Sequence, residues 1–464
     1  MSSVKTFHNE YLLKSIIWLK IRDLMEGEEK VKSKGEIYLP KPNKKWSKEK
    51  YEAYLARAVF FNALNRTIQG LSGMVFRKSP VVNTPDAFNY ITIDCDMSGR
   101  SLLTMAQHVI NEVLSLGRHG ILVDYSGDTT GMTVSEIKSS GARAKILTYN
   151  AEDIINWRKS KGRFTLIVLR ENIEEESSLD IFSTTKSTVY RVLNLDSNGF
   201  YNIRTFKETD GNTVEEGEPK YVKIKGKNMK YIPFFGINQD GSDFSQCCEP
   251  TMNDLANLSL AHYRTDADKR NTDHLLACPT LFIKGYGEDD DSDGGLIAYG
   301  PDKPIVLKNT DADAKFLEIS EKGSLRTSLQ DLEEKMAAFG ARFLSSEKKG
   351  AEAPETEMIR RQGEMSILGN IAFLVSMAIT QALKVAAEFD GFSDSDVDDI
   401  KFELNNNFMP TSIDPALLTA MADLVATGMF SKKDFFWNLQ HAELVQPDVT
   451  YDQYIASIEN DGIV

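Results

Sequence analysis

Apolar residues recur with helical spacing, three or four positions apart, in five long stretches of the chain. These stretches predict helices over residues 48–71, 101–116, 250–277, 324–344 and 355–388. Gly70 and Gly73 are expected to close the first helix, and Pro250 is expected to open the third. The fourth helix has a regular apolar seam, formed by Leu325, Leu329, Leu332, Met336, Phe339 and Phe343. Toward the C-terminal end, three shorter helices are expected to begin near residues 414, 431 and 450.

Between residues 143 and 235 the pattern changes to short apolar runs, which predict strands. The turn signal Asp196-Ser-Asn-Gly199 predicts a hairpin between residues 188–195 and 200–206. Further strands are expected at residues 120–125, 164–169, 280–283, 305–307, 316–319 and 400–405. Because the strands and the long helices occupy mostly separate stretches, the pattern predicts an α+β fold.

The composition is that of a globular protein. The chain has 464 residues, of which 41% are hydrophobic and 26% charged, and this length suits about three compact units. Four cysteines, at positions 95, 247, 248 and 278, are too few for a disulfide framework and favour a reducing compartment. The N-terminal stretch carries charges throughout and offers no clean signal-peptide core, so we expect a soluble protein made inside the cell.

The charge of the chain is unevenly distributed. The formal net charge is −14, yet residues 1–78 hold 16 basic and 8 acidic residues, whereas residues 392–464 hold 3 and 13. A protein that grips duplex DNA needs a basic stripe, so this distribution argues against tight DNA binding. It permits a protein that handles DNA without holding it. A solvated acidic surface that aids solubility is the simpler alternative.

No motif predicts catalysis or a metal centre. Asp289, Asp291, Asp293 and Gly294 match the first half of a calcium loop, but Gly300 stands where the bidentate glutamate is needed. A solvent-exposed acidic loop is therefore favoured. The six histidines show no metal-binding spacing, and the sequence has no nucleophile elbow and no phosphate-binding loop. We expect no enzyme activity, no cofactor and no metal.

Two further patterns each have two interpretations. Residues 367–387 are apolar enough to suggest a membrane span, but Asn370, Gln381 and Lys384 interrupt them and favour a buried helix within a large assembly. A basic ladder could contact nucleic acid, although a solvated strand face is favoured. It consists of Lys220, Lys223, Lys225, Lys227 and Lys230.

Four segments, read together in chain order, form a more specific pattern than any of these motifs. The first is Tyr51-x-x-Tyr54-x-x-Arg57-Ala58, continued by Phe61-Asn62-x-x-Asn65-Arg66-Thr67-Ile68-x-Gly70-Leu71-x-Gly73-x-Val75-Phe76-Arg77-Lys78. The others are Leu116-Gly117-Arg118-x-Gly120-Ile-Leu-Val-Asp124, Tyr149-Asn-Ala-Glu-Asp-Ile-Ile-Asn-Trp157 and Leu255-Ala-x-Leu-x-Leu-Ala-His-Tyr-Arg-x-x-Ala-Asp268. Together they resemble the DUF4055 family of tailed-bacteriophage portal proteins, over about residues 48–283. Beyond these residues the agreement is in architecture more than in sequence.

The resemblance implies a portal fold, with an α/β wing, a stem of two helices separated by a clip, a tunnel loop, a long wing helix and a crown. It divides this chain into an N-terminal arm (1–47), the wing (48–249), stem helices (250–277 and 324–344), the clip (278–323), the tunnel loop (345–358), the long wing helix with a wing strand (359–405) and the crown (406–464).

The function that the resemblance implies is that of a ring, usually of twelve subunits, at one vertex of a capsid. Terminase would drive DNA through its channel during packaging, DNA would leave through it on ejection, and the tail or head-completion proteins would attach to it. The implied partners are other copies of this chain, the major capsid protein, the terminase large subunit, a head-completion or tail adaptor protein and double-stranded DNA, with no membrane. The implied location is the virion, after assembly in the host cytoplasm.

Two alternatives remain open. One is another structural ring, such as a head–tail adaptor, which is usually much shorter than this chain. The other is a capsid-associated nuclease, which would need clustered carboxylates or a nucleophile.

Three groups of residues are expected to carry the portal function. The tunnel loop would meet DNA in the channel through Lys348, Lys349, Glu352, Arg360 and Arg361. The clip would dock terminase or an adaptor through Glu288, Asp289, Asp290, Asp291 and Asp293. The two stem helices would pack through Leu255, Leu258, Leu325, Leu329, Leu332, Met336 and Phe339.

Overall fold

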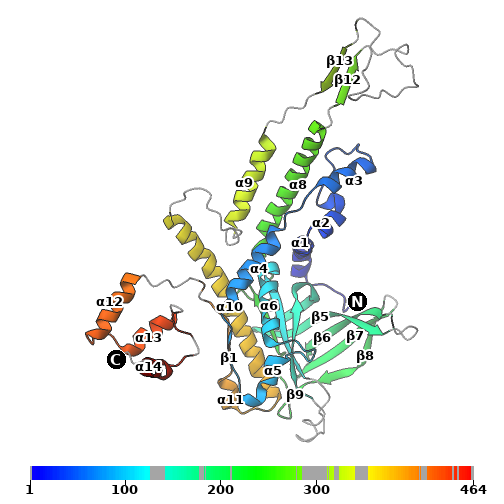
Figure 1. Cartoon of the computed structure of the whole chain (residues 1–464). Coiled ribbons are helices and arrows are strands. Elements are labelled where there is room, and N and C mark those ends of the chain that lie inside the picture. Colours follow the sequence, from blue (N-terminus) through cyan, green and yellow to red (C-terminus); the bar gives the residue numbers. More distant parts are fainter. Residues whose placement is uncertain are drawn as a thin grey trace.

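The computed structural model confirms an α+β fold. It describes residues 3–125, 142–176, 182, 184–209, 212–277, 280–284, 311, 313–317, 323–339, 354–406, 408, 415–441, 444–446 and 449–460. In residues 175–176, 209, 280–281, 316–317, 354–366, 415–417, 441 and 459–460 the description covers the backbone alone. Figure 1 shows a broad body of helices and sheets from which a pair of helices projects, with a β-hairpin at its far end.

Helices from the first quarter of the chain form one side of the main core. They are α1 (Asn9–Glu26), α2 (Glu28–Ser33), α3 (Lys48–Arg57), α4 (Ala63–Val75), α5 (Tyr90–Ile93) and α6 (Leu102–Leu116). Trp18, Ile21 and Leu24 of α1 are fully buried, so residues before position 48 contribute to the core. The apolar spacing correctly predicted α6, which begins after the capping side chain of Ser101 and ends at Gly117 in the left-handed conformation.

The predicted helix over residues 48–71 is wrong as a single element, because the structure breaks it into α3 and α4. Ala58 has extended backbone angles, and the Asn62 side chain accepts a hydrogen bond from the Asn65 amide, which starts a new helix. Gly70 and Gly73 do not end α4, which continues to Val75. The apolar periodicity runs through the break, which explains why it suggested one helix.

A three-stranded antiparallel sheet lies behind α6. Its strand order is β11-β2-β3, with β2 spanning Arg118–Tyr125, β3 Ala144–Asn150 and β11 Phe234–Asn238. Gly120 faces Gly236 in the register, and a Cβ on Gly120 would lie only 2.3 Å from Cζ of Phe234. Glycine is thus required here by the close approach of an aromatic ring.

A five-stranded antiparallel meander forms the second sheet, in the order β4-β5-β6-β7-β8. Its strands are β4 (Ile154–Ser160), β5 (Arg163–Glu176), β6 (Thr184–Leu195), β7 (Tyr201–Thr209) and β8 (Asn212–Tyr221). The predicted hairpin is confirmed: Leu195 pairs with Tyr201 across the turn, where Gly199 is left-handed. The lysine ladder falls on β8, on the short pair β9 (Lys223–Ile224) and β10 (Lys227–Asn228), and just beyond, where its lysines are exposed.

The projecting pair consists of α8 (Met252–Ala277) and α9 (Ser324–Ala338). Beyond their outer ends, β12 (Thr280–Lys284) pairs with β13 (Asp313–Leu317). The predicted strand at residues 305–307 lies outside the described residues, as does the part of the fourth predicted helix after residue 339.

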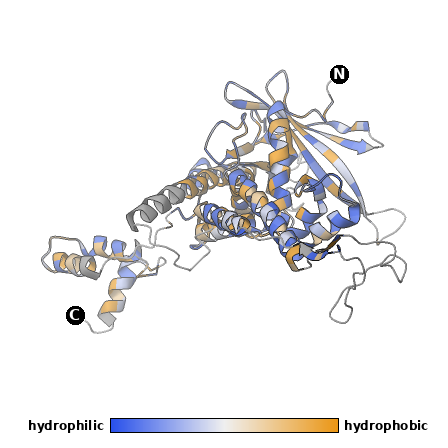
Figure 2. Ribbon diagram, turned by 90° about the horizontal axis from the view of Figure 1, so that it is seen from above, coloured by the Kyte–Doolittle hydropathy of each residue, from blue (hydrophilic) through white to orange (hydrophobic). Residues whose placement is uncertain are grey.

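The chain returns to the body through α10 (Pro354–Phe389), which contacts β2, β3, β11 and α6. After α11 (Asp394–Asp398), strand β14 (Lys401–Glu403) pairs with β1 (Val81–Asn83). The three predicted C-terminal helices are present as α12 (Pro415–Ala426), α13 (Lys432–His441) and α14 (Tyr451–Asn460). Figure 2 shows them set apart from the main body.

Candidate functional site

The two projecting helices pack against each other through a narrow apolar contact. Leu255 of α8 and Met336 of α9 are buried, and Met336 belongs to the main core cluster. The Ser259 hydroxyl lies 3.9 Å from the Met336 sulfur, and His262 Nε2 lies 3.6 Å from Glu333. The contact is therefore concentrated near the base of the projection, where α8 enters the body.

The residues predicted to pack the stem take different positions. Besides Leu255 and Met336, Leu329 is buried, and Leu258 is a partly buried residue that packs against the main core. Leu325 and Leu332 are half-buried, and Phe339 is exposed at the end of α9.

Helix α3 supports the outer half of α8 from the side (Figure 1). The Tyr54 hydroxyl donates to Asp268 at 2.6 Å, and the Arg57 guanidinium donates to Asn271 at 3.1 Å. Burial and the neighbouring carboxylate raise the pKa of Tyr54 well above its usual value, so it stays a neutral hydrogen-bond donor. These bonds reach no further than Asn271, and the described residues of α8 beyond it are all at least partly exposed.

The remaining predicted functional residues are less fully described. The acidic residues 288–293 of the predicted clip and the tunnel-loop residues Lys348, Lys349 and Glu352 lie outside the described residues. Arg360 and Arg361 lie in the first turns of α10. Their roles stay predictions.

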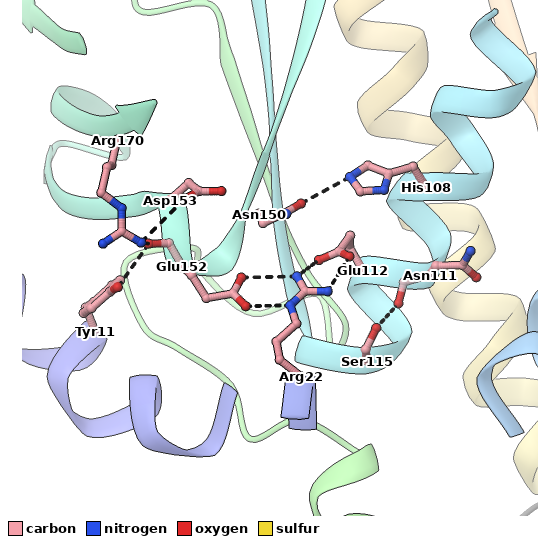
Figure 3. Close-up of polar contacts among 10 residues, drawn as sticks. All are labelled: Tyr11, Arg22, His108, Asn111, Glu112, Ser115, Asn150, Glu152, Asp153 and Arg170. Carbon is pink, nitrogen blue, oxygen red and sulfur yellow. Dashed lines mark hydrogen bonds and ion pairs between the residues drawn. The ribbon is translucent and has the colours of Figure 1, made fainter. Parts of the chain in front are cut away.

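A partly buried charged network, which the sequence analysis did not find, holds α1 in place (Figure 3). Arg22 donates to both carboxylate oxygens of Glu112 on α6, and its Nε donates to Glu152 at 2.7 Å. The backbone carbonyl of Glu152 accepts from the Tyr11 hydroxyl at 3.0 Å and from Arg170 of β5 at 2.9 Å. One arginine thus links α1 to α6 and to the short helix η3 (Ala151–Asp153), which are 90 and 130 residues away in sequence.

Burial makes this network sensitive to loss of any partner. Burial opposes the charge of Arg22, but its hydrogen bonds to Glu112 and Glu152 outweigh that cost and raise its pKa. Burial also raises the pKa of Asp153 to about 6, although Arg170 acts in the opposite direction. Asp153 lies 3.6 Å from Arg170, a distance that suits a loose ion pair.

Two histidines lie beside the network. His108 of α6 contacts Asn150 at 3.2 Å, and its ring lies 5.4 Å from that of His119 on β2. His119 is fully buried, and burial together with the adjacent His108 holds its pKa well below the usual value. His119 is therefore a neutral core side chain near neutral pH.

One signal for the network was present in the sequence. Met105, Val109, Glu112 and Leu116 follow helical spacing, so Glu112 falls on the buried face of α6. A carboxylate on a buried face requires a cationic or hydrogen-bonding partner. No local pattern, however, identifies Arg22 as that partner.

Within the described part of the chain, no three His, Cys, Asp or Glu side chains are placed to share a metal ion. Residues 367–389 of α10 are long and apolar enough to cross a membrane by length and composition, with a mean hydropathy of 1.5. Half of the tested stretch is buried in this chain, and Val375, Ile379 and Leu383 lie in the core.

Comparison with solved structures finds similarity to chains of gene transfer agent (GTA) particles. One is from the neck of an empty GTA particle with C6 symmetry, with 11% identity, a TM-score of 0.42, and 80% of this chain and 87% of that chain covered. A chain from the virion of a native GTA particle has 11% identity and a TM-score of 0.44, over 82% and 91%. A chain from the neck of a native GTA particle with C12 symmetry has 12% identity and a TM-score of 0.42, over 85% and 94%. No curated protein matches the sequence.

The family comparison matches residues 251–390 to DUF4055, described as a domain of unknown function. The match runs from the start of α8 to the end of α10. Of the four segments that resemble this family, only residues 255–268 fall inside it, so the matched part lies further toward the C-terminus than the resemblance suggested. Residues 251–390, which span the projecting helices and the long helix that follows them, are thus similar to the DUF4055 family.

Proposed function

We propose that the chain is a subunit of a portal ring at one vertex of a phage-type capsid. In this role it is a structural protein of the virion, not an enzyme. Double-stranded DNA passes through the ring during packaging by terminase and during ejection. The major capsid protein surrounds the ring, and a head-completion or tail adaptor protein attaches to it.

The projecting helices α8 and α9 are the observation that best supports this proposal. They leave the body as a two-helix stem with a small β-hairpin at the far end (Figure 1). Exposed apolar side chains lie along this projection, including Leu275, Phe282 and Phe339. A long hairpin with so little buried surface gains stability when copies of it pack side by side, as the stems of a ring do.

The order of elements supports the same proposal. The pair α8 and α9 encloses the β12–β13 hairpin, and the chain then returns through a 36-residue helix, α10, to the body. This is the order of stem, clip, stem and long wing helix that the portal resemblance implies. In this arrangement residues 278–323 face terminase or the adaptor, and residues 345–358 face the channel.

The charges expected in the channel follow from its task. Many simultaneous lysine and arginine contacts to phosphates would hold DNA, so we infer a channel lining that is largely neutral or acidic. Lys348 and Lys349 touch phosphates transiently, while Glu352 keeps each contact weak. Residues 392–464, in which acidic side chains outnumber basic ones, are candidates for the lumen of the crown.

Native mass spectrometry combined with negative-stain imaging tests this proposal. For a subunit of 52.0 kDa, the expected result is a closed ring of about half a megadalton or more with a central channel. A chain that remains a monomer or dimer at micromolar concentration contradicts the portal assignment. A reconstruction of the ring at side-chain resolution that shows a channel lined throughout by lysine and arginine contradicts the proposed lining instead.

A further inference from the structure

Helix α1 presents an apolar surface on its outer side, opposite the side that packs into the core. The outer stripe, as we name it, consists of Leu12, Leu13, Ile16 and Leu19, which are 53%, 68%, 76% and 55% exposed. Leu12, Ile16 and Leu19 follow the spacing i, i+4 and i+7, so they form one ridge along the helix. Together these side chains expose a few hundred Å² of apolar surface, a size that marks interaction sites on soluble proteins.

The inner side of α1 fixes the direction of this stripe. Trp18 and Ile21 are fully buried, and Arg22 is bound to carboxylates on two other elements (Figure 3). Rotating α1 to bury the stripe would expose Trp18 and break the Arg22 network. A helix that is apolar on both sides is normally buried on both sides, and no element in the described part of the chain covers the outer stripe, so we look for its cover on a second copy.

A groove on another part of the chain has matching properties. It is a pocket of about 540 Å³ between α10, β11 and the turn that joins β4 to β5. Its walls include Phe164, Phe235, Leu374 and Met377, and Met377 is 49% exposed. We call it the α10 groove. Aliphatic and aromatic side chains form most of its wall and suit leucine and isoleucine, and Lys159, Arg163 and Gln381 add polar groups to it.

The helices that carry the stripe and one wall of the groove lie on opposite sides of α4 and α6. Both α1 and α10 contact α4 and α6, and Figure 1 shows α4 and α6 between them. The stripe is a ridge and the groove is concave, so their shapes are complementary. Because α4 and α6 lie between α1 and α10, the stripe does not reach the groove of its own chain. A closed ring needs two different, complementary surfaces on each subunit, because every subunit contacts its neighbours head to tail.

We propose that the outer stripe of one copy docks into the α10 groove of the neighbouring copy. This inference rests on the proposed ring and names one of its contacts. The arrangement is helix-in-groove recognition, with Leu12, Ile16 and Leu19 as anchors. The stripe is smaller than the roughly 800 Å² per partner that a standard interface buries, so it forms one part of a larger contact.

Cysteine crosslinking in the full-length chain tests the docking directly. Four samples are compared under mild oxidation: Ile16→Cys alone, Met377→Cys alone, a mixture of these two single variants, and the double variant Ile16→Cys/Met377→Cys. Head-to-tail docking predicts a ladder of linked multimers from the double variant, and only dimers when the two single variants are mixed. Each single variant by itself should stay unlinked, which also controls for the native cysteines.

A charge variant provides a second measurement. Ile16→Glu should raise the concentration needed for ring assembly by about tenfold or more, because it places a carboxylate in an apolar contact. Val214→Glu changes an exposed apolar residue of β8 instead and serves as the matched control, with no such shift expected.

The outcomes separate this inference from the proposed function. If the unmodified chain forms no ring, the proposed portal function fails and this contact fails with it. If rings form but the double variant gives no ladder, or if Ile16→Cys links to itself, the docking is wrong while the ring stands. Normal assembly of Ile16→Glu also overturns the docking.

Discussion

The network around Arg22 gives the sharpest prediction, which concerns the variant Arg22→Met. Methionine keeps most of the side-chain volume but removes every hydrogen bond to Glu112 and Glu152. The Glu112 side chain is only 7% exposed, so it is left as a buried carboxylate without a partner. Glu152 is 24% exposed and can be hydrated in part, so most of the cost arises at Glu112.

The size of the effect follows from the cost of protonating Glu112. A buried carboxylate that has lost its partner takes up a proton when the free energy of protonation is smaller than the free energy cost of keeping the charge buried. Starting from an ordinary glutamate pKa of about 4.3, protonation costs about 1.4 kcal/mol per pH unit, which is about 4 kcal/mol at pH 7 and about 1 kcal/mol at pH 5. We therefore expect Arg22→Met to lower the free energy of unfolding by about 3–4 kcal/mol at pH 7 and much less at pH 5.

Denaturant unfolding at both pH values measures this difference, and hydrogen–deuterium exchange locates it. Exchange should rise first in residues 9–26, because Arg22 holds α1 to the body. Two variants serve as controls. Glu112→Gln in the Arg22→Met background should recover most of the loss, and Lys186→Met, which removes an exposed pair with Glu174, should cost less than about 0.5 kcal/mol. An equal loss at pH 5 and pH 7, or no recovery by Glu112→Gln, would refute the reasoning.

Three further predictions concern other parts of the chain. Burial raises the pKa of Asp153 to about 6, so the folded chain keeps a proton there that the unfolded chain releases above about pH 4. The free energy of unfolding should therefore fall as the pH rises from 4 to 6, by at most about 3 kcal/mol. Asp153→Asn should remove that slope in pH-dependent unfolding, and an unchanged slope would show that another group causes it. Met336→Ala should cost about 2–5 kcal/mol in denaturant unfolding, whereas Phe339→Ala, at an exposed position of the same helix, should cost far less; equal effects would contradict the packing described for α9. Replacing Lys348 and Lys349 by Ala should leave ring assembly intact but change the amount of DNA packaged or retained per particle, and normal packaging and retention would remove these lysines from the channel argument.

The sequence by itself determined those elements whose signals are local. Helices α6, α8 and α10 were predicted to within about three residues, because apolar periodicity, capping side chains and glycine or proline lie within the element or next to it. The hairpin between β6 and β7 was predicted for the same reason, since Asp196 and Gly199 form its turn without help from the rest of the chain. The stem seam was also visible as spacing, although spacing could not show that Leu329 and Met336 are buried while Phe339 is exposed.

Only the tertiary structure decided the features that depend on distant residues. It placed α1, whose two apolar sides leave no clear period in the sequence. It also separated α3 from α4, and in α3 it brought Tyr54 and Arg57 into hydrogen bonds with α8. It also brought Arg22 to Glu112 and Glu152, across 90 and 130 residues. The physical reason is the same in each case. Local signals change the energy of a few neighbouring residues, whereas a buried ion pair or an apolar contact forms only where folding brings distant side chains together and excludes water.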